Sequence, residues 1–75
     1  MIKMIKVESD GNGEFDYSAY QVGTKRYAFY DVFDKDHISV YINYARHCTL
    51  DKFDINDIDM ASKIITTIEK LMLFK

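Results

Sequence analysis

The residues best suited to catalysis are a histidine and a cysteine at adjacent positions, His47 and Cys48. A cysteine nucleophile needs a base within hydrogen-bond reach and a third group that orients this base. Neighbouring residues at the end of a strand point in different directions, and no oxyanion loop or second histidine stands beside the pair. A chain of 75 residues also leaves little room for a substrate pocket of the usual ~300 Å³ or more. We therefore predict no catalytic residue and interpret Cys48 as a small, buried apolar side chain.

Carboxylates form two clusters, from which we select as a candidate acidic patch Asp31, Asp34, Asp36, Asp54 and Asp57. Such a patch would bind a basic partner or imitate a row of phosphates, although acidic clusters are also common as solvated surface. The clusters lack the twelve-residue calcium-loop pattern, which has glycine at its sixth position and glutamate at its twelfth. Cys48, His47 and His37 are too few to form a structural zinc site. We expect neither a metal nor a cofactor.

Tyrosines and one arginine form the strongest candidate for a binding surface. Both residue types are enriched at protein interfaces, and tyrosine supplies a large contact area with few rotatable bonds. The alternation of side chains along the expected strands places on one exposed face of a sheet the partner-binding candidates Tyr20, Arg26, Tyr30, Val32 and Tyr41, together with Met4 and Val22. Tyrosine is also a good strand former, so this clustering has a purely structural interpretation as well.

The same face permits a second interpretation, in which its three tyrosines stack on the bases of a single strand of nucleic acid. Arg26, Lys3 and Lys6 would then contact phosphates. Such platforms normally carry a basic groove, whereas this chain has 12 acidic and 10 basic residues and a formal net charge of -2. Binding to another protein is therefore the leading hypothesis, and binding to nucleic acid is the alternative.

The element that would position these residues is a hairpin over residues 27–44, which reverses at Asp34-Lys35-Asp36. From Ile38 onward, apolar side chains alternate with polar ones, which predicts a strand with one buried face. A two-residue turn would place Phe33 opposite Ile38. Asp31 then falls on the buried face, where we expect a bulge or an edge position to relieve the carboxylate.

The remaining segments suggest two earlier strands and one helix. We predict strands over residues 1–7 and 14–22, joined by a glycine-containing loop over 8–13, and a loop at Gly23 that places Ala19 opposite Tyr27. Residues 46–56 read as an irregular connection. From Ile58 onward apolar residues recur every three or four positions, which predicts a helix capped by Asn56 or Asp54. The expected fold is α+β in a single domain over 1–75: a four-stranded antiparallel meander sheet with one C-terminal helix packed on one face (ββββα), in two layers.

Composition bears on association and location. The single cysteine allows no internal disulfide. Hydrophobic residues make up 48% of the chain and aromatic residues 15%, which is more than so small an interior needs. We therefore expect a homodimer that buries the excess apolar surface. No signal sequence or membrane-spanning stretch is apparent, which predicts a cytoplasmic protein without membrane contact. In size, acidity and its use of Ile, Lys, Asp and Asn, the chain resembles small accessory proteins of phages and mobile elements. This resemblance implies a non-enzymatic protein that inhibits or modulates a host protein by covering its surface.

Overall fold

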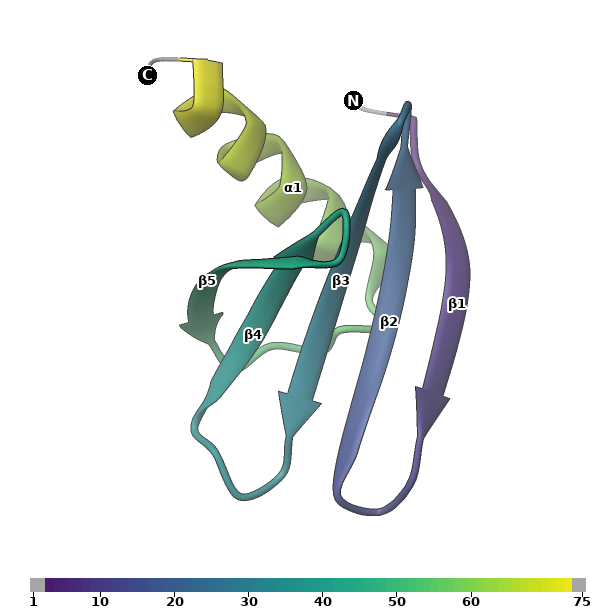
Figure 1. Ribbon diagram of the computed structural model, residues 1–75, viewed down its shortest axis with the longest axis vertical. Helices are drawn as coiled ribbons and strands as arrows, with labels where there is room; N and C mark the ends of the chain where they lie inside the picture. Colours follow the sequence, from purple (N-terminus) through teal and green to yellow (C-terminus); the bar gives the residue numbers. More distant parts are fainter. Residues whose placement is uncertain (1–2, 74–75) are drawn as a thin grey trace.

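The computed structural model of the chain describes residues 3–73. In chain order it contains the strands β1 (Ile5–Gly11), β2 (Phe15–Val22), β3 (Lys25–Val32), β4 (His37–Ile42) and β5 (Ala45–Asp51) and the helix α1 (Ile58–Leu73). The strands form one antiparallel sheet in that same order, and α1 lies across one face of it (Figure 1). The predicted α+β fold, an antiparallel sheet with one C-terminal helix, is confirmed, but the sheet has five strands and not four.

The strand that was not predicted is β5, which occupies most of the expected irregular connection. The chain reverses at Asn43 and Tyr44, whose φ angles of 50° and 70° are both positive, as in a type I′ turn. The second position of such a turn normally holds glycine, so a tyrosine there disguised the reversal. The Asn43 backbone N–H donates to the Arg26 carbonyl oxygen at 2.8 Å, and its Oδ1 accepts from the Arg26 backbone N–H at 2.9 Å. These two bonds fix the turn to the start of β3.

The first strand lies further along the chain than its predicted place at residues 1–7. β1 runs through most of the expected loop, while positions 1 and 2 lie outside the described residues. The reversal after β1 is tight because Oδ1 of Asn12 accepts hydrogen bonds from the backbone N–H groups of Glu14 and Phe15, at 3.0 and 3.2 Å. An asparagine that bonds the backbone in this way forms a turn by itself, so the polar residues before it remain free to pair with β2.

The pairing of β3 with β4 differs from the predicted register by two positions. Ile38 lies opposite Asp31 and not Phe33, because the loop between the strands contains the four residues 33–36. A shift of two leaves every side chain on its predicted face. The pairs are regular at Asp31, so no bulge forms there. Of the two expected solutions it is the position near the turn that is found, because Asp31 is the last residue of β3 that pairs with β4, and its carboxylate forms an ion pair with Lys52.

The pairing of β2 with β3 differs from the predicted register by one position, and this exchanges the faces of β2. Ala19 lies opposite Ala28, and Tyr20 lies opposite Tyr27. The cause is a two-residue turn, Gly23-Thr24, with a positive φ of 60° at the glycine, whereas a loop centred on Gly23 was expected. Tyr20 therefore faces the helix.

The helix begins after Asp57, which replaces the predicted caps Asn56 and Asp54. Oδ1 of Asp57 accepts hydrogen bonds from the backbone N–H groups of Asp59 at 3.0 Å and Met60 at 3.2 Å, two of the donors that a helix leaves unpaired at its start. Oδ1 of Asp54 accepts from the backbone N–H of Asn56 at 3.0 Å and so closes the preceding turn. The two aspartates together direct the chain from the end of the sheet into α1.

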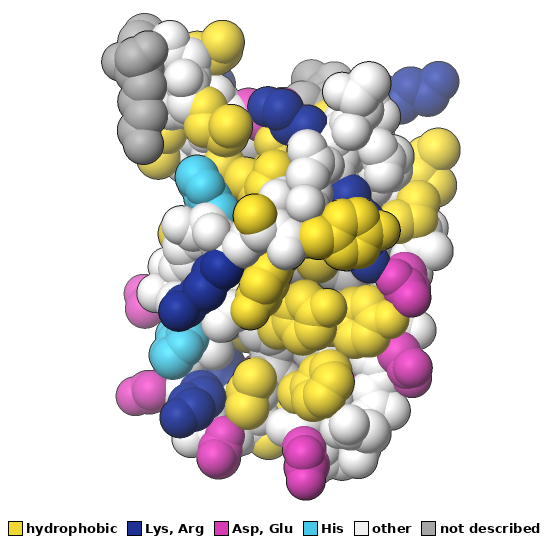
Figure 2. All heavy atoms as spheres, viewed as in Figure 1, with side chains coloured by type: hydrophobic (Ala, Val, Ile, Leu, Met, Phe, Trp, Pro, Cys, Tyr) yellow, Lys and Arg dark blue, Asp and Glu magenta, His cyan; other side chains and the backbone are white. Residues whose placement is uncertain are grey.

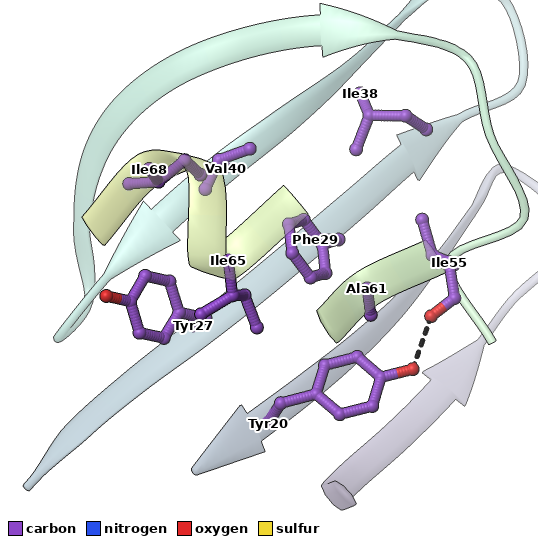
Figure 3. Packing of buried hydrophobic residues seen from close by; sticks show 9 residues of the cluster. All are labelled: Tyr20, Tyr27, Phe29, Ile38, Val40, Ile55, Ala61, Ile65 and Ile68. Carbon is purple, nitrogen blue, oxygen red and sulfur yellow. Dashed lines mark hydrogen bonds between the residues drawn. The ribbon is translucent and has the colours of Figure 1, made fainter. Parts of the chain in front are cut away.

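The hydrophobic core lies between α1 and the face of the sheet that it covers (Figure 3). Its buried members are Tyr20, Tyr27, Phe29, Ile38, Val40, Ile55, Ala61, Ile65 and Ile68. Tyr20 donates its hydroxyl hydrogen to the backbone oxygen of Ile55 at 2.6 Å, and Tyr27 donates to Oε2 of Glu69 at 3.0 Å. Both tyrosines thus contribute buried apolar area without leaving a polar atom unpaired. Within residues 3–73, no helix is long and apolar enough to cross a membrane.

Candidate functional site

The side of the sheet opposite α1, hereafter the open face, carries a cluster of aromatic side chains. This aromatic patch consists of Phe15 and Tyr17 from β2, Tyr30 from β3 and Tyr41 from β4. Figure 2 shows hydrophobic side chains gathered over the middle of this face, with charged side chains toward its borders. The four residues are all half-buried, so part of each ring remains accessible.

The rings of the aromatic patch are ordered by the pairing of the strands. Tyr17 and Tyr30 are cross-strand partners, and their rings stack at 17° with centroids 5.1 Å apart. Tyr30 also meets Tyr41 edge-on at 5.1 Å and 67°, and Phe15 at 6.0 Å. Such contacts each add about 0.5–1.5 kcal/mol beyond the area that they bury. Tyr30 is therefore the centre of a rigid aromatic surface.

Two alanines form the floor beside these rings. Ala19 and Ala28 oppose each other on the open face, yet both side chains are 0% exposed. Since α1 lies on the other side of the sheet, larger neighbours on the open face must cover them. The small pair makes room for the rings to lie close to the backbone.

A polar network borders the patch around Arg26. The guanidinium Nη2 of Arg26 lies 2.5 Å from Oε1 of Glu8, and its Cζ lies 4.5 Å from the centre of the Tyr44 ring. The Tyr17 hydroxyl, and next the Arg26 guanidinium, hold the pKa of the Glu8 carboxyl below its usual range. The same carboxylate raises the pKa of Tyr17 to about 12. The network extends the alkaline range over which Tyr17 stays protonated, and the Glu8 carboxylate offsets the charge of Arg26.

Tyr44 is the most exposed ring on this side of the molecule. It has a φ of 70° and is 77% exposed. The left-handed conformation costs a residue with a Cβ roughly 1–2 kcal/mol. Non-glycine residues held in this region cluster at binding and catalytic sites, which makes Tyr44 a candidate site residue.

The predicted partner-binding residues divide into two groups. Arg26, Tyr30, Val32 and Tyr41 lie on the open face, as predicted. The placement of Tyr20 there is wrong, because it is 0% exposed beneath α1 and bonded to Ile55. Val22 and Met4 also pack against the core and not on the open face.

Three residues of the open face were not predicted as site residues: Phe15, Tyr17 and Tyr44. The first two were assigned to the buried face by the one-residue error in the register of β2. Glycine followed by threonine fits a two-residue hairpin turn, and this signal alone would have placed both rings correctly. For Tyr44 the sequence offers no comparable signal.

Most carboxylates of the candidate acidic patch are engaged in contacts within the chain. Asp31 is paired with Lys52, whose ammonium also donates to the backbone oxygen of Val32 at 2.9 Å. Asp54 and Asp57 serve the turn and the cap at the start of α1. Asp34 and Asp36 remain exposed in the loop between β3 and β4. Three of the five aspartates therefore have structural roles.

Residues suited to metal binding or nucleophilic catalysis do not converge. Within residues 3–73, no group of three or more His, Cys, Asp or Glu side chains is arranged to hold a metal ion. Cys48 is half-buried on β5, where burial raises the pKa of its thiol and so disfavours the reactive thiolate. Comparison with protein-family models, curated proteins and solved structures finds no match to this chain.

Proposed function

We propose that this chain is a non-enzymatic binding protein that covers a surface of another protein with the open face of its sheet. The observation that carries this proposal is the aromatic patch. The exposed face of an antiparallel sheet is ordinarily polar, whereas here four half-buried rings occupy it in fixed mutual geometry. Within residues 3–73, no element covers these rings.

Rigidity favours the aromatic patch as a binding surface. Ordering flexible side chains on association costs roughly 0.5–1.5 kcal/mol for each one. Tyr30 is already held by three neighbouring rings, and Arg26 by Glu8 and Tyr44. A partner would therefore contact large side chains whose conformational freedom was already lost when the chain folded. Such preordered side chains are typical of the residues that dominate binding energy.

The class of partner follows from composition and charge. The chain resembles small accessory proteins of phages and mobile elements, which supports a role as an inhibitor or modulator of a host protein in the cytoplasm. Homodimer formation forms part of the proposal, because large apolar side chains such as Leu71 and Leu73 are exposed, at 64% and 81%. The oligomeric state and the identity of the partner are determined in separate experiments.

Nucleic-acid binding is the alternative, and two features of the open face weigh against it. Tyr17 and Tyr30 stack on each other, so the ring surfaces between them are not available to bases. Arg26 is paired with Glu8, which leaves less positive charge for a phosphate. A stacking platform normally combines free ring faces with a basic groove.

The test is affinity capture from a lysate of the source cells or their host, with and without nuclease. We compare the wild type with a Tyr30→Ser, Tyr41→Ser double variant, and use Ile58→Ser as the matched control because this side chain is 52% exposed at the start of α1, on the other side of the sheet. The proposal predicts a protein that is retained after nuclease, lost with the double variant and kept by the control. Capture that requires nucleic acid, or is equally lost with Ile58→Ser, would contradict it.

A further inference from the structure

The turn that joins β1 to β2, at the lower end of the sheet in Figure 1, places an asparagine directly before a glycine. These residues are Asn12 and Gly13, and both are exposed. The side-chain amide of an asparagine can be attacked by the backbone nitrogen of the next residue, and glycine hinders this attack least because it has no side chain. Since both reactants belong to one turn, their reaction is intramolecular and needs no encounter.

The backbone nitrogen of Gly13 is free to act as the nucleophile. Within the described residues 3–73, its N–H group donates no hydrogen bond. Gly13 has a φ of 86°, and apart from its chain neighbours nothing lies within 4 Å of the point that a Cβ would occupy. Gly13 also lines an open hollow of about 610 Å³ between this turn and the loop after β3, so water reaches the turn.

The amide of Asn12 is held by donors that stabilise the charge of such a reaction. Attack on Cγ moves negative charge onto Oδ1, and this oxygen already accepts from the backbone N–H groups of Glu14 at 3.0 Å and Phe15 at 3.2 Å. Two N–H groups directed at an oxygen that gains charge form the oxyanion hole of acyl-transfer enzymes. The Asn12 N–H donates in turn to the Phe15 carbonyl oxygen at 3.1 Å, which fixes the donors in place.

We propose that this turn is a self-modifying site, at which Asn12 is converted through a cyclic imide to aspartate and isoaspartate. The Gly13 nitrogen gives its proton to hydroxide and bonds to Cγ of Asn12, while the side-chain nitrogen takes a proton from water and leaves as ammonia. Water then adds to one ring carbonyl and breaks its bond to the Gly13 nitrogen. Addition at Cγ yields aspartate, and addition at the backbone carbonyl yields isoaspartate. Water is the only reactant consumed, and the inference does not depend on the proposed function.

The other two asparagines of the chain lack this combination and serve as internal controls. Asn43 is followed by Tyr44, whose side chain hinders its backbone nitrogen, and within residues 3–73 its Oδ1 accepts from a single backbone N–H. Asn56 is followed by Asp57, whose N–H is already bonded to the carbonyl oxygen of Asp54 at 3.0 Å. Both asparagines should therefore react more slowly in the folded protein than in the unfolded chain.

The two products differ in their effect on β1. Aspartate keeps an oxygen that accepts from the same two N–H groups, so the turn should persist. Isoaspartate adds one carbon atom to the main chain inside the turn that sets the pairing of β1 with β2. β1 is an edge strand and pairs with β2 alone, and its Glu8 holds Arg26 in an ion pair. The isoaspartate product should therefore loosen β1.

The first test compares the full chain when folded and when unfolded in guanidinium chloride, at one pH and temperature. Ion exchange detects the added negative charge, and peptide mass spectrometry assigns it to a residue. We expect Asn12 to react roughly tenfold faster in the folded chain, which is less than the roughly 10²–10³ that one oxyanion donor contributes in a dry enzyme site, because this turn is exposed to water. Asn43 and Asn56 should show the opposite order.

The second test removes one donor. Glu14→Pro lacks the N–H group that lies closer to Oδ1 of Asn12, and its folded-state rate should fall roughly three- to tenfold. Glu14→Gln is the matched control, because it keeps this N–H group and should keep the wild-type rate. Circular dichroism confirms that each variant folds, and the first test decides alone if Glu14→Pro does not.

Hydrogen exchange of the separated products tests the effect on β1. Amides of β1 should exchange roughly tenfold or more faster in the isoaspartate product than in the wild type, because this edge strand opens locally. The variant Asn12→Asp is the matched control and should exchange like the wild type.

Two results would overturn the proposed site: a folded chain in which Asn12 reacts no faster than in the unfolded chain, or a folded Glu14→Pro protein that reacts as fast as Glu14→Gln. Wild-type exchange in the isoaspartate product would overturn the proposed effect on β1.

Discussion

At the scale of single residues, Tyr44 shows how local strain and surface chemistry are combined. Its backbone adopts a conformation suited to glycine, while its ring lies against the Arg26 guanidinium and is 77% exposed. The contact with the guanidinium returns only about 0.5–1 kcal/mol at an exposed site, which is less than the roughly 1–2 kcal/mol cost of the conformation. Stability alone does not account for a tyrosine at this position.

Replacing Tyr44 by glycine should separate stability from binding. We expect Tyr44→Gly to raise the free energy of unfolding by up to about 1 kcal/mol, because glycine adopts positive φ without strain, and at the same time to weaken partner capture. Urea unfolding measures the first effect. Tyr44→Ala is the matched control, since it loses the ring but keeps the strained Cβ, and it should be less stable than Tyr44→Gly. A Tyr44→Gly protein clearly less stable than the wild type would contradict this account.

The buried tyrosines predict how stability depends on pH in the alkaline range. Burial first, and nearby carboxylates second, raise the pKa values of Tyr20 and Tyr27 above their usual 10. In the unfolded chain both hydroxyls ionise near pH 10, while in the folded protein they stay protonated, so their contribution to stability is complete below pH 10 and is lost as the pH rises further.

The measurement is the urea midpoint between pH 8 and pH 11. The wild type should lose stability steeply at the upper end, and Tyr27→Phe should lose less, because one of the two buried hydroxyls is gone. Ile65→Val is the matched control and should keep the wild-type slope, because it disturbs the same core without removing an ionisable group. If stability fell with pH as steeply in Tyr27→Phe as in the wild type, burial of the Tyr27 hydroxyl would not be a cause of the alkaline loss of stability.

At the scale of elements, the cap of α1 provides a test of how the helix starts. Asp57→Ala should lower the free energy of unfolding by about 1 kcal/mol, because the first backbone donors of α1 lose their acceptor. Asp57→Asn retains an acceptor oxygen and should stay close to the wild type. If Asn56→Ala had the larger effect under the same conditions, the cap would be assigned to the wrong residue.

The elements that were predictable from sequence are those whose side chains repeat with a clear period. The apolar stripe that includes Ala61, Ile65 and Ile68 identifies α1, and the alternation from Ile38 identifies β4. The β3–β4 register was wrong by two positions, yet the facing survived because strands repeat every two residues. For β2 an error of one position was enough to place Tyr20 on the wrong face.

The elements that were not predictable depend on turns whose residues are atypical. β5 was hidden by a tyrosine at a position that normally requires glycine, and its edge position gives it few buried side chains to show a pattern. The extent of β1 depends on Asn12, whose side chain closes the turn. Four residues of the open face were found from the sequence: Arg26, Tyr30, Val32 and Tyr41. Phe15 and Tyr17 were missed although the Gly23-Thr24 turn signals their facing, and only Tyr44 required the structure.

At the scale of the whole molecule, the sheet separates two surfaces: α1 closes the core on one face, and the open face carries the aromatic patch. Homodimer formation, which is part of the proposed function, would give each dimer two such patches for a target that repeats or that is itself a dimer. Two linked sites retain a multivalent surface more strongly than either site alone, without any new contact.

The stacked rings of Tyr17 and Tyr30 also have an optical consequence. The chain contains no tryptophan, so its near-ultraviolet absorption and emission come chiefly from its six tyrosines. Two phenol rings held nearly parallel at 5.1 Å couple their electronic transitions and should give a strong near-ultraviolet circular dichroism band. Any ligand that tilts or separates them would change this band. The near-ultraviolet circular dichroism band of the two rings thus reports, without any label, whether a ligand occupies the open face, even before that ligand is identified.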